Sequence, residues 1–401
     1  MVRVPAEIFG QIASLLTRVD LVSLSRVSPA SREESNRLLY HDVDLSDLPV
    51  DFLGRDRVLR RASDRPIDVF LTTISTSPTH ALLVKSFAFR LPYQPAEGVD
   101  PQNALQAMTN LRRLTVVSVL SEDAFPSYLH GCTADLRELD VGLPLNGDLF
   151  TFLSRRSKIH QVTLGKEKMD CGVDSDPSRR PLPGREQFLP NLTKLRAIED
   201  AVPLALLCPS LTELDIVVSE RQDFSSVMDV LALVGKQLNR LRCQRSLFYG
   251  SDAIVQHLSS LAGATPNLEV LDILEYFCGG WGNPPCIQVS SFPNTTTSLT
   301  YPSVLLAQYL SDLEALVLDG KWAKLRTINW TSHLSCHDHL VYWKGENLCD
   351  RIFESLPSVV GLKYTEECLL EVNSSVTFSY QRVEPAGVEW RDVFRGVAKP
   401  L

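Results

Sequence analysis

The sequence of 401 residues lacks the motifs that mark most enzyme active sites. It has no Gly-rich phosphate-binding loop, no nucleophile elbow and no repeated Cys-x-x-Cys pair. Its nine cysteines are odd in number and scattered, without the close spacing of a disulfide framework. We therefore expect no enzymatic activity and no cofactor, and we expect the protein in a reducing compartment, the cytoplasm or the nucleus.

Long apolar runs and an excess of positive charge are missing as well. No stretch reaches membrane-spanning length, and residues 1–7 have no apolar run of the signal-peptide type. We therefore expect neither a membrane partner nor a secretory leader. Lys and Arg number 40 against 48 Asp and Glu, a net charge of −8. A general nucleic-acid binder needs a basic stripe to displace counterions, so nucleic acid is not an expected partner.

One group of residues has the chemistry of a metal site, but not its spacing. His333, Cys336, His337 and His339 lie close together, with Cys349 further on, and a set of His and Cys ligands can bind zinc. Adjacent Cys and His side chains rarely converge on one metal, however, and no second ligand pair follows at zinc-finger spacing. We interpret the group as a loop with hydrogen-bonding histidines and expect no bound metal.

Two apolar stripes at helical spacing open the chain. Pro5 suits the first position of a helix, Asp20 is expected to cap a second helix, and Ser28-Pro29 is expected to begin a third. About 40 residues are too few for an independent core, so part of this apolar surface needs a partner, either the rest of the chain or another protein. The stripes consist of Ile8, Phe9, Ile12, Leu15 and Leu16, and then of Leu21, Leu24 and Val27.

Residues 1–45 resemble an F-box, the three-helix module that docks on the Skp adaptor of cullin-type ubiquitin ligases. The resemblance rests on Val4-Pro5-x-Glu7-Ile8, Ile12, Leu15-Leu16 and Asp20-Leu21-x-x-Leu24-x-x-Val27-Ser28, and on the stretch from Arg37 to Leu45, which is similar to that of many fungal members. Where the family usually has a large aromatic residue, this sequence has Pro29-Ala30-Ser31. The alternative is an ordinary amphipathic hairpin that caps the next domain. The resemblance implies a Skp-type adaptor and, through it, a cullin as partners, with adaptor contacts from Pro5, Ile8, Ile12, Leu16, Leu21 and Leu24.

After a helical linker at residues 46–80, with a helix expected from Pro66 to near Ser77, one apolar pattern returns throughout the chain. An apolar residue is followed by two others, an apolar residue, one other and an apolar residue, mostly at the twenty-to-thirty residue period of leucine-rich repeats. The fold class that we predict is α/β, a short three-helix F-box followed at residues 81–401 by an irregular leucine-rich-repeat solenoid, a curved parallel sheet with outer helices. The alternative is a single α/β domain with parallel strands. The copies begin at Val84, Leu111, Leu136, Ile159, Leu192, Leu211, Leu238, Leu268, Leu313, Leu325 and Val359.

The array is irregular in three places. Loops are expected near residues 165–187 and 279–303, and the spacing of 12 residues between Leu313 and Leu325 is too short for a full repeat. At Leu325 we expect a hairpin or a single broken unit. The aromatic residue Trp281 in the second loop is a candidate binding anchor.

Within each strand, the residues between the buried positions are expected to share the concave face. Their charges either neutralise one another across neighbouring strands or select a partner by complementarity, and the sequence leaves both open. We predict a substrate-recognition subunit of a Skp-cullin-F-box ubiquitin ligase, with an unidentified substrate protein bound on this face. The alternative is a non-catalytic leucine-rich-repeat interaction scaffold without a ligase role. The candidate substrate-binding residues are Glu138, Asp140, Lys194, Arg196, Glu213, Asp215, Arg240, Arg242, Asp272 and Trp281.

Overall fold

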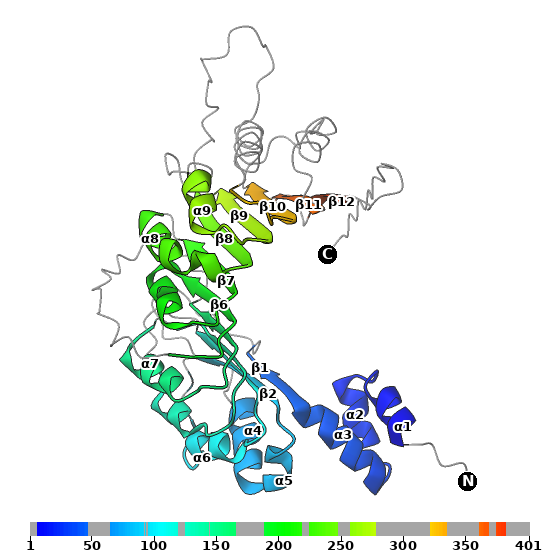
Figure 1. Ribbon diagram of the computed structural model, residues 1–401. Helices are drawn as coiled ribbons and strands as arrows, with labels where there is room; N and C mark the ends of the chain where they lie inside the picture. Colours follow the sequence, from blue (N-terminus) through cyan, green and yellow to red (C-terminus); the bar gives the residue numbers. More distant parts are fainter. Residues whose placement is uncertain are drawn as a thin grey trace, which may run out of the picture. The chain divides into compact units, whose positions relative to one another are not determined.

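The computed structural model shows a mixed α/β protein in which a parallel sheet dominates (Figure 1). The chain divides into two compact units, Met1–Leu192 and Thr193–Leu401. Within the part that the structure describes, no helix has the length and apolar character needed to cross a membrane. The described residues are 6–46, 65–91, 93, 95–118, 125–143, 145–165, 188–218, 224–247, 257–277, 321–334, 361–368 and 374–381.

The first unit begins with three short helices. Ser28 and Pro29 start the third helix as predicted, because the Ser28 hydroxyl accepts a hydrogen bond from the Ser31 backbone N–H at 3.1 Å. The expected cap of the second helix is wrong, since Thr17 caps it and Asp20 lies in its first turn. The Thr17 hydroxyl accepts from the Asp20 N–H at 3.3 Å and donates to the Asp20 carboxylate at 2.7 Å, so the two side chains share the cap. The helices are α1 (Ala6–Ala13), α2 (Arg18–Leu24) and α3 (Pro29–His41).

The repeats start earlier than the sequence pattern indicated. Residues 42–45, at the end of the F-box resemblance, form strand β1 (Asp42–Leu45), which pairs in parallel with β2 (Ser86–Leu91). Tyr40-x-x-Val43-x-Leu45 is therefore a further copy of the repeat. The Lys85 N–H donates to the His41 carbonyl at 3.0 Å, as the Arg112 N–H does to the Lys85 carbonyl one repeat later. The last turn of α3 is thus also the start of the first repeat.

The rest of the first unit follows the predicted alternation of strands and return segments. Strands β1 to β5 pair in chain order, all parallel, and the helices α4 to α7 line one side of them (Figure 1). The helix expected in the linker is confirmed as α4. The remaining elements are α4 (Arg65–Thr76), α5 (Pro78–Ala81), α6 (Pro101–Ala107), β3 (Arg113–Ser118), η1 (Ser127–Gly131), β4 (Glu138–Val141), α7 (Gly147–Ser154) and β5 (Gln161–Leu164).

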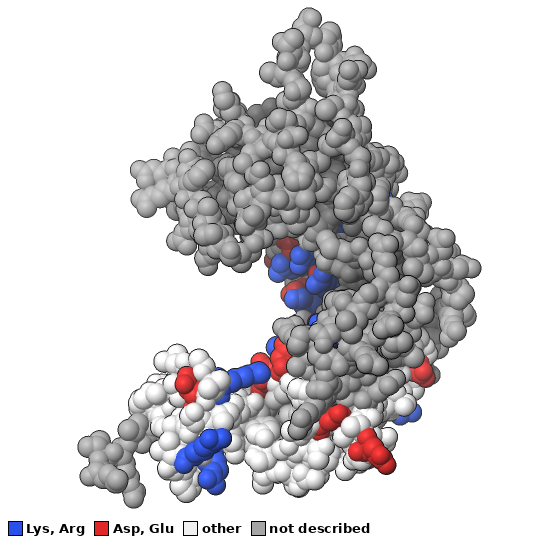
Figure 2. All heavy atoms as spheres, turned by 180° about the vertical axis from the view of Figure 1, so that it is seen from behind, with Lys and Arg blue, Asp and Glu red and all other residues white. Residues whose placement is uncertain are grey.

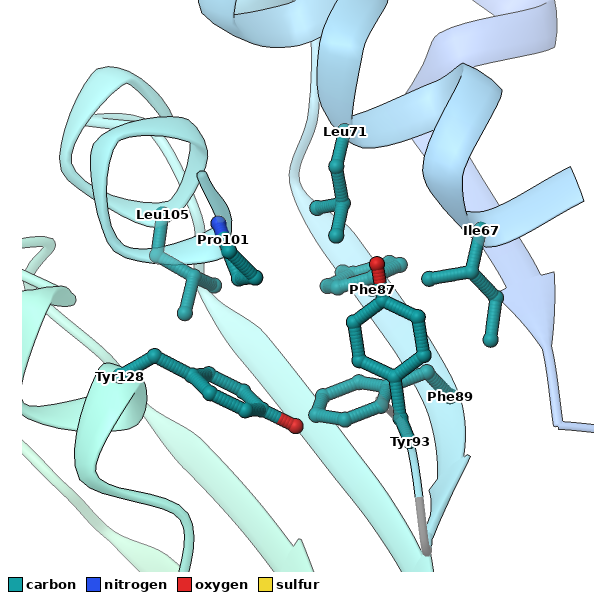
Figure 3. Close-up of a pocket in the computed structure, with 8 residues that line it drawn as sticks. All are labelled: Ile67, Leu71, Phe87, Phe89, Tyr93, Pro101, Leu105 and Tyr128. Atoms are coloured by element: carbon teal, nitrogen blue, oxygen red, sulfur yellow. The ribbon is translucent and has the colours of Figure 1, made fainter. Parts of the chain in front are cut away.

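A small apolar pocket lies where α4 and α6 pack on β2 (Figure 3). The Tyr93 hydroxyl donates to Asp68 on α4 at 2.5 Å, so this ring is fixed at the pocket wall. Aromatic and aliphatic side chains alone line the pocket, and we interpret it as a packing space in the core. The lining residues are Ile67, Leu71, Phe87, Phe89, Tyr93, Pro101, Leu105 and Tyr128.

The second unit continues the same pattern. Strands β6 to β11 pair in parallel and in chain order, and β12, which the pattern did not predict, pairs antiparallel with β11. Gly235 packs so close to the Ala264 carbonyl that a Cβ at this position would collide with it. The elements are β6 (Lys194–Ile198), η2 (Glu199–Leu207), β7 (Glu213–Val218), α8 (Ser225–Val234), η3 (Gly235–Gln237), β8 (Arg240–Leu247), α9 (Leu258–Ala264), β9 (Val270–Phe277), β10 (Thr327–Leu334), β11 (Gly361–Cys368) and β12 (Ser374–Gln381).

The copy at Leu325 is not half of a hairpin, since β10 pairs in parallel with β9 on one side and with β11 on the other. Leu325 is fully buried and leads into β10, a full strand that pairs in parallel with β9. Trp322 anchors this repeat, because its buried indole N–H donates to the Thr265 carbonyl at 3.1 Å. The preceding copy at Leu313 and most of both predicted loops, residues 166–187 and 279–303, lie outside the described residues.

Candidate protein-interaction surfaces

The first candidate surface lies on the N-terminal helices. Among the described residues, six of the ten exposed large apolar side chains lie between positions 8 and 27. We call these six the apolar helix surface. They are Ile8, Ile12, Leu15, Val19, Val22 and Val27, with exposed fractions of 46%, 51%, 86%, 76%, 43% and 73%.

The interior of the three helices is built from small residues, which is why the larger ones remain outside. Ala13 and Ser35 are fully buried, Ser31 is 7% exposed, and Leu21 is the one large side chain among them at 6%. At Gly10 a Cβ would lie 2.9 Å from the Glu34 carboxylate, so α1 and α3 approach closely there. An interior of this size buries few apolar atoms, and half of the eight stripe residues are exposed.

The residues predicted to contact an adaptor fall into three groups. Ile8 and Ile12 are exposed, and Leu16 and Leu24 are half-buried. Leu21 is interior, so on geometric grounds it supports the helices instead of contributing to their surface. Pro5 lies outside the described residues. The predicted set did not include Leu15, Val19, Val22 and Val27, whose apolar character is the signal in the sequence.

The position at which the F-box family usually has an aromatic residue is occupied by the start of α3. Ser31 is buried, and its hydroxyl lies 2.5 Å from the hydroxyl of Ser28. The two serines thus cap the helix where a large ring would otherwise fill space. Small residues therefore pack closely at the position where the F-box family usually has a large ring.

The three helices are joined to the repeats by specific contacts. The Tyr40 ring stacks on His80 of α5 with centroids 4.5 Å apart, and on Phe70 of α4 at 6.4 Å. The Asn36 amide nitrogen lies 3.3 Å from Nε2 of His80, and the Arg18 guanidinium donates to the Asp42 carbonyl at 3.2 Å. Since α3 also runs into β1 without a loop, the apolar helix surface and the first repeats belong to one body.

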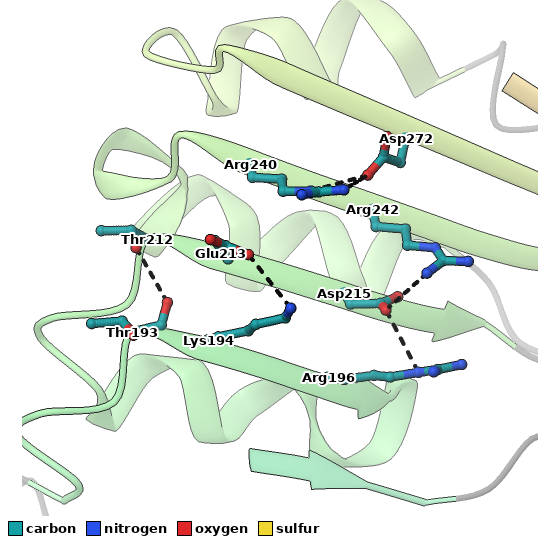
Figure 4. Close-up of polar contacts among 9 residues, drawn as sticks. All are labelled: Thr193, Lys194, Arg196, Thr212, Glu213, Asp215, Arg240, Arg242 and Asp272. Atoms are coloured by element: carbon teal, nitrogen blue, oxygen red, sulfur yellow. Dashed lines mark hydrogen bonds and ion pairs between the residues drawn. The ribbon is translucent and has the colours of Figure 1, made fainter. Parts of the chain in front are cut away.

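The second candidate surface is a charged ladder in the second unit, made of Lys194, Arg196, Glu213, Asp215, Arg240, Arg242 and Asp272 (Figure 4). The parallel register aligns these residues in two rows across the strands. One row is Lys194, Glu213 and Arg240, and the other is Arg196, Asp215, Arg242 and Asp272. These are the residues that the repeat pattern placed on one face, and the structure brings them together.

Asp215 lies at the centre of the second row. Its Oδ2 is 3.5 Å from Nε of Arg196 and 3.7 Å from Nη1 of Arg242, whereas its Oδ1 is buried without a hydrogen-bond partner. Burial raises the pKa of Asp215, and the two arginines oppose that shift without cancelling it. The carboxylate is therefore incompletely compensated inside the ladder.

Asp272 is held more firmly. Its Oδ2 accepts from Nη2 of Arg240 at 2.7 Å and from Nε at 3.1 Å, and the Asn329 amide donates to its Oδ1. Arg240 thus bonds to the neighbouring strand β9, although Glu213 is its register partner on β7. Glu213 instead forms an ion pair with Lys194 at 3.8 Å.

The cations and the acids of the ladder differ in exposure. The side chains of Lys194, Arg196, Arg240 and Arg242 are 44%, 35%, 47% and 39% exposed, whereas those of Asp215 and Asp272 are 12% and 11% exposed. Glu213, at 38%, is the one acid of the ladder that solvent reaches to a similar degree. In Figure 2, Lys and Arg side chains lie together with Asp and Glu side chains in one cluster.

The remaining predicted substrate-binding residues do not extend this ladder. Glu138 forms an ion pair with Arg113 of β3 in the first unit, and Asp140, two residues further along β4, is exposed. Trp281 lies outside the described residues.

Sequence reasoning missed a row of amides that link successive repeats. Asn110, Asn191 and Asn267 each immediately precede the first apolar residue of a copy, and each donates its side-chain N–H to a carbonyl of the preceding repeat. The acceptors are the carbonyls of Leu82, Ser157 and Lys236, at 2.8, 2.8 and 2.7 Å. The signal was present as Asn directly before Leu in these copies. These amides link the stacked repeats to one another.

Within the described ranges, no group of three or more His, Cys, Asp or Glu side chains has the arrangement of a metal site. His333 lies in β10, but Cys336, His337, His339 and Cys349 fall outside the described residues, so the interpretation of this group remains a prediction.

Comparison with known proteins places the chain in no family. No family model matches it, and no curated protein matches its sequence. Among solved structures, it is similar to an internalin from Listeria monocytogenes str. 4b F2365, with 11% sequence identity, a TM-score of 0.31, and coverage of 74% of this chain and 87% of that chain. A TM-score of that size carries no inference about function.

Proposed function

We propose that this protein is the substrate-recognition subunit of a Skp-cullin-F-box ubiquitin ligase. The apolar helix surface docks on the Skp-type adaptor, and the sheet face holds the substrate protein near the ubiquitin-charged enzyme. Catalysis is then by proximity alone, with no chemistry in this chain. The setting is the cytoplasm or the nucleus, where the adaptor and the cullin operate.

The observation that carries the proposal is the concentration of exposed apolar side chains on α1, α2 and the turns that follow each of them. Scattered single apolar residues are normal on a protein surface, whereas a group of them marks an interaction site. The described repeats leave four large apolar side chains exposed, Val69, Leu82, Leu206 and Leu233, and these are spread over both units. The six residues of the apolar helix surface suit an apolar partner surface. The F-box resemblance of residues 1–45 implies that this partner is the Skp-type adaptor.

The test is a pull-down of the full-length chain with the Skp-type adaptor. Ile12→Asp and Leu15→Asp each place a charge where an apolar contact is expected, and burying an apolar side chain of this size is worth about 1.5–3 kcal/mol. Both residues are more than half exposed, so the substitutions leave the interior of the helices intact. We expect each variant to lose most adaptor binding while its helix content and melting temperature stay unchanged.

Leu233→Asp is the matched control. Leu233 is 72% exposed on α8, in the other unit, and takes the same change from leucine to aspartate. It should retain the adaptor at wild-type yield. Deleting residues 1–45 is a poor test, because the deletion also removes β1 and Tyr40 from the first repeats. Wild-type recovery of the adaptor by Ile12→Asp and Leu15→Asp would refute the assignment.

The alternative function is an interaction scaffold without a ligase role. The small-residue interior at Ser31 and Ser35 favours this alternative, because the family's usual aromatic residue is absent there. A scaffold shares the sheet face and predicts that the wild-type chain itself fails to recover the adaptor. The same pull-down therefore separates the two functions.

A further inference from the structure

In the charged ladder of β6 to β9, the basic side chains are more exposed than most of the acidic ones. Four basic side chains have between 35% and 47% of their surface exposed, and two of the three acidic side chains have 12% or less. Counted over all seven residues the ladder is nearly neutral. Counted over the side chains that solvent reaches well, it carries four positive charges against one negative charge, that of Glu213.

The buried acids hold the basic side chains in place. Asp272 binds Arg240 through two nitrogen atoms, and Asp215 lies between Arg196 and Arg242. Because an arginine has five N–H donors in a planar fork, a guanidinium held by one carboxylate oxygen still presents donors to a second acceptor. Ordering these long side chains before a ligand arrives reduces the entropy lost on binding.

The spacing of the basic groups suits an extended acidic peptide. Along one strand, residues two apart on the same face are separated by about 6.5–7 Å, and neighbouring parallel strands lie about 4.8 Å apart. Arg240 and Arg242 follow the first spacing along β8, and Arg196 and Arg242 stand two strands apart in one row. An extended peptide with carboxylates at alternate positions repeats the first spacing, so that successive carboxylates meet successive cations.

We propose that the charged ladder binds an extended, acidic segment of a partner protein through its exposed Arg and Lys side chains, with carboxylates of the segment at alternate positions. The inference rests on the proposed function in that the segment would belong to the recruited substrate. It concerns a different surface from adaptor docking, and it is tested without the adaptor. Attraction between such surfaces depends on charge complementarity and weakens with salt.

The experiment measures binding of a fluorescent eight-residue peptide with aspartate at alternate positions to the full chain by fluorescence anisotropy. An isosteric peptide with asparagine in place of aspartate is compared at the same salt concentration. We expect the acidic peptide to bind and the asparagine peptide to bind roughly tenfold more weakly, within a range of about two- to thirtyfold, since two or more exposed ion pairs are lost. Equal binding of the two peptides, or no binding of either at low salt, would overturn the proposal.

Three variants locate the site. The double variant Arg196→Gln with Arg242→Gln should lose roughly tenfold in affinity for the acidic peptide, by the same count of ion pairs. Lys236→Gln, at an exposed position on η3, removes the same kind of charge away from the strands and should leave affinity unchanged. Asp215→Asn should act in the opposite direction, with roughly two- to fivefold tighter binding, because the amide oxygen still accepts from the arginines and keeps them ordered while the negative charge that competes for them is removed.

The direction in which each substitution changes peptide affinity distinguishes a binding surface from a ladder that only neutralises its own charges. A ladder that serves only to neutralise itself predicts no gain from Asp215→Asn, and such a result would contradict the proposal even if the double variant unfolds. Competition by a single-stranded oligonucleotide of equal charge, at equal strength, would identify a general polyanion surface and also overturn it. Peptide binding is measured without the adaptor, so the result of the Ile12→Asp pull-down does not affect it. Either proposal can therefore be refuted while the other stands.

Discussion

Tyr40 provides the sharpest test of where the repeats begin. If Tyr40-x-x-Val43-x-Leu45 is a repeat copy, the Tyr40 ring is a structural part of the first unit and not the end of a separate helical module. Its ring stacks on His80 at 4.5 Å and on Phe70 at 6.4 Å. Ring pairs of this kind are worth about 0.5–1.5 kcal/mol each beyond their buried area, so Tyr40→Ala should cost about 1–3 kcal/mol.

Thermal unfolding and hydrogen exchange of the full chain measure this effect. One kcal/mol lowers the melting temperature by about 2–4 °C for a folding unit of this size, and Tyr40→Ala should also increase exchange at the amides of β1 and the end of α3. Tyr40→Phe is the matched control, because it keeps both stacked rings. Should Tyr40→Ala melt and exchange like Tyr40→Phe, α3 would be an independent module and the reasoning about the junction would be refuted.

Two further predictions concern the second unit. Asn267→Ala removes the hydrogen bond to the Lys236 carbonyl and should lower the free energy of unfolding by about 0.5–1.5 kcal/mol in denaturant titrations; an unchanged midpoint would show that the amide row does not link the repeats. Because burial raises the pKa of Asp215, its ionised form is less stable in the folded chain than in the unfolded chain, and stability falls as pH rises from the unfolded pKa of about 3.9 through the folded value. Asp215→Asn should therefore stabilise the protein at pH 7 and lose that advantage near pH 3, as followed by melting temperature against pH, and a destabilised variant at pH 7 would contradict this.

The strands were predictable because their pattern is set by burial. In each described copy from Val84 to Leu325, the first two apolar positions are buried, as a parallel sheet covered by helices on one side requires. The first copy was missed because Tyr40 also belongs to α3, and a residue that ends a helix and begins a repeat satisfies two periodicities at once. The antiparallel pairing of β12 left no signal, since it breaks the repeat.

The sequence pattern predicted which residues belong to each surface, but not which of their side chains are exposed and which are buried. Apolar spacing identified the stripe on α1 and α2, yet it could not show that Leu21 points inward while Leu15 points outward, because small residues such as Ala13 and Ser35 fill the interior. In the ladder, the alternation of apolar and charged residues along each strand predicted that the acids and the bases share one face. The shorter aspartates lie close to the sheet, and the longer arginines extend past them. This difference in side-chain length decides which charge a partner meets.

The junction between α3 and β1 has a consequence for how docking and recognition are coupled. Domain motions need a few loop or terminal residues that absorb changes in backbone angles. Here His41 is the last residue of α3, and Asp42, the C-cap, is already the first residue of β1, with its backbone extended at φ −132° and ψ 100°. The His41 carbonyl accepts a hydrogen bond from the Lys85 N–H. No residue is left between helix and strand to act as a hinge, and Tyr40 holds the same point from the helix side. A partner that binds the apolar helix surface therefore fixes the direction of the first strand as well, and under the proposed function the adaptor would orient the first repeats instead of merely tethering them.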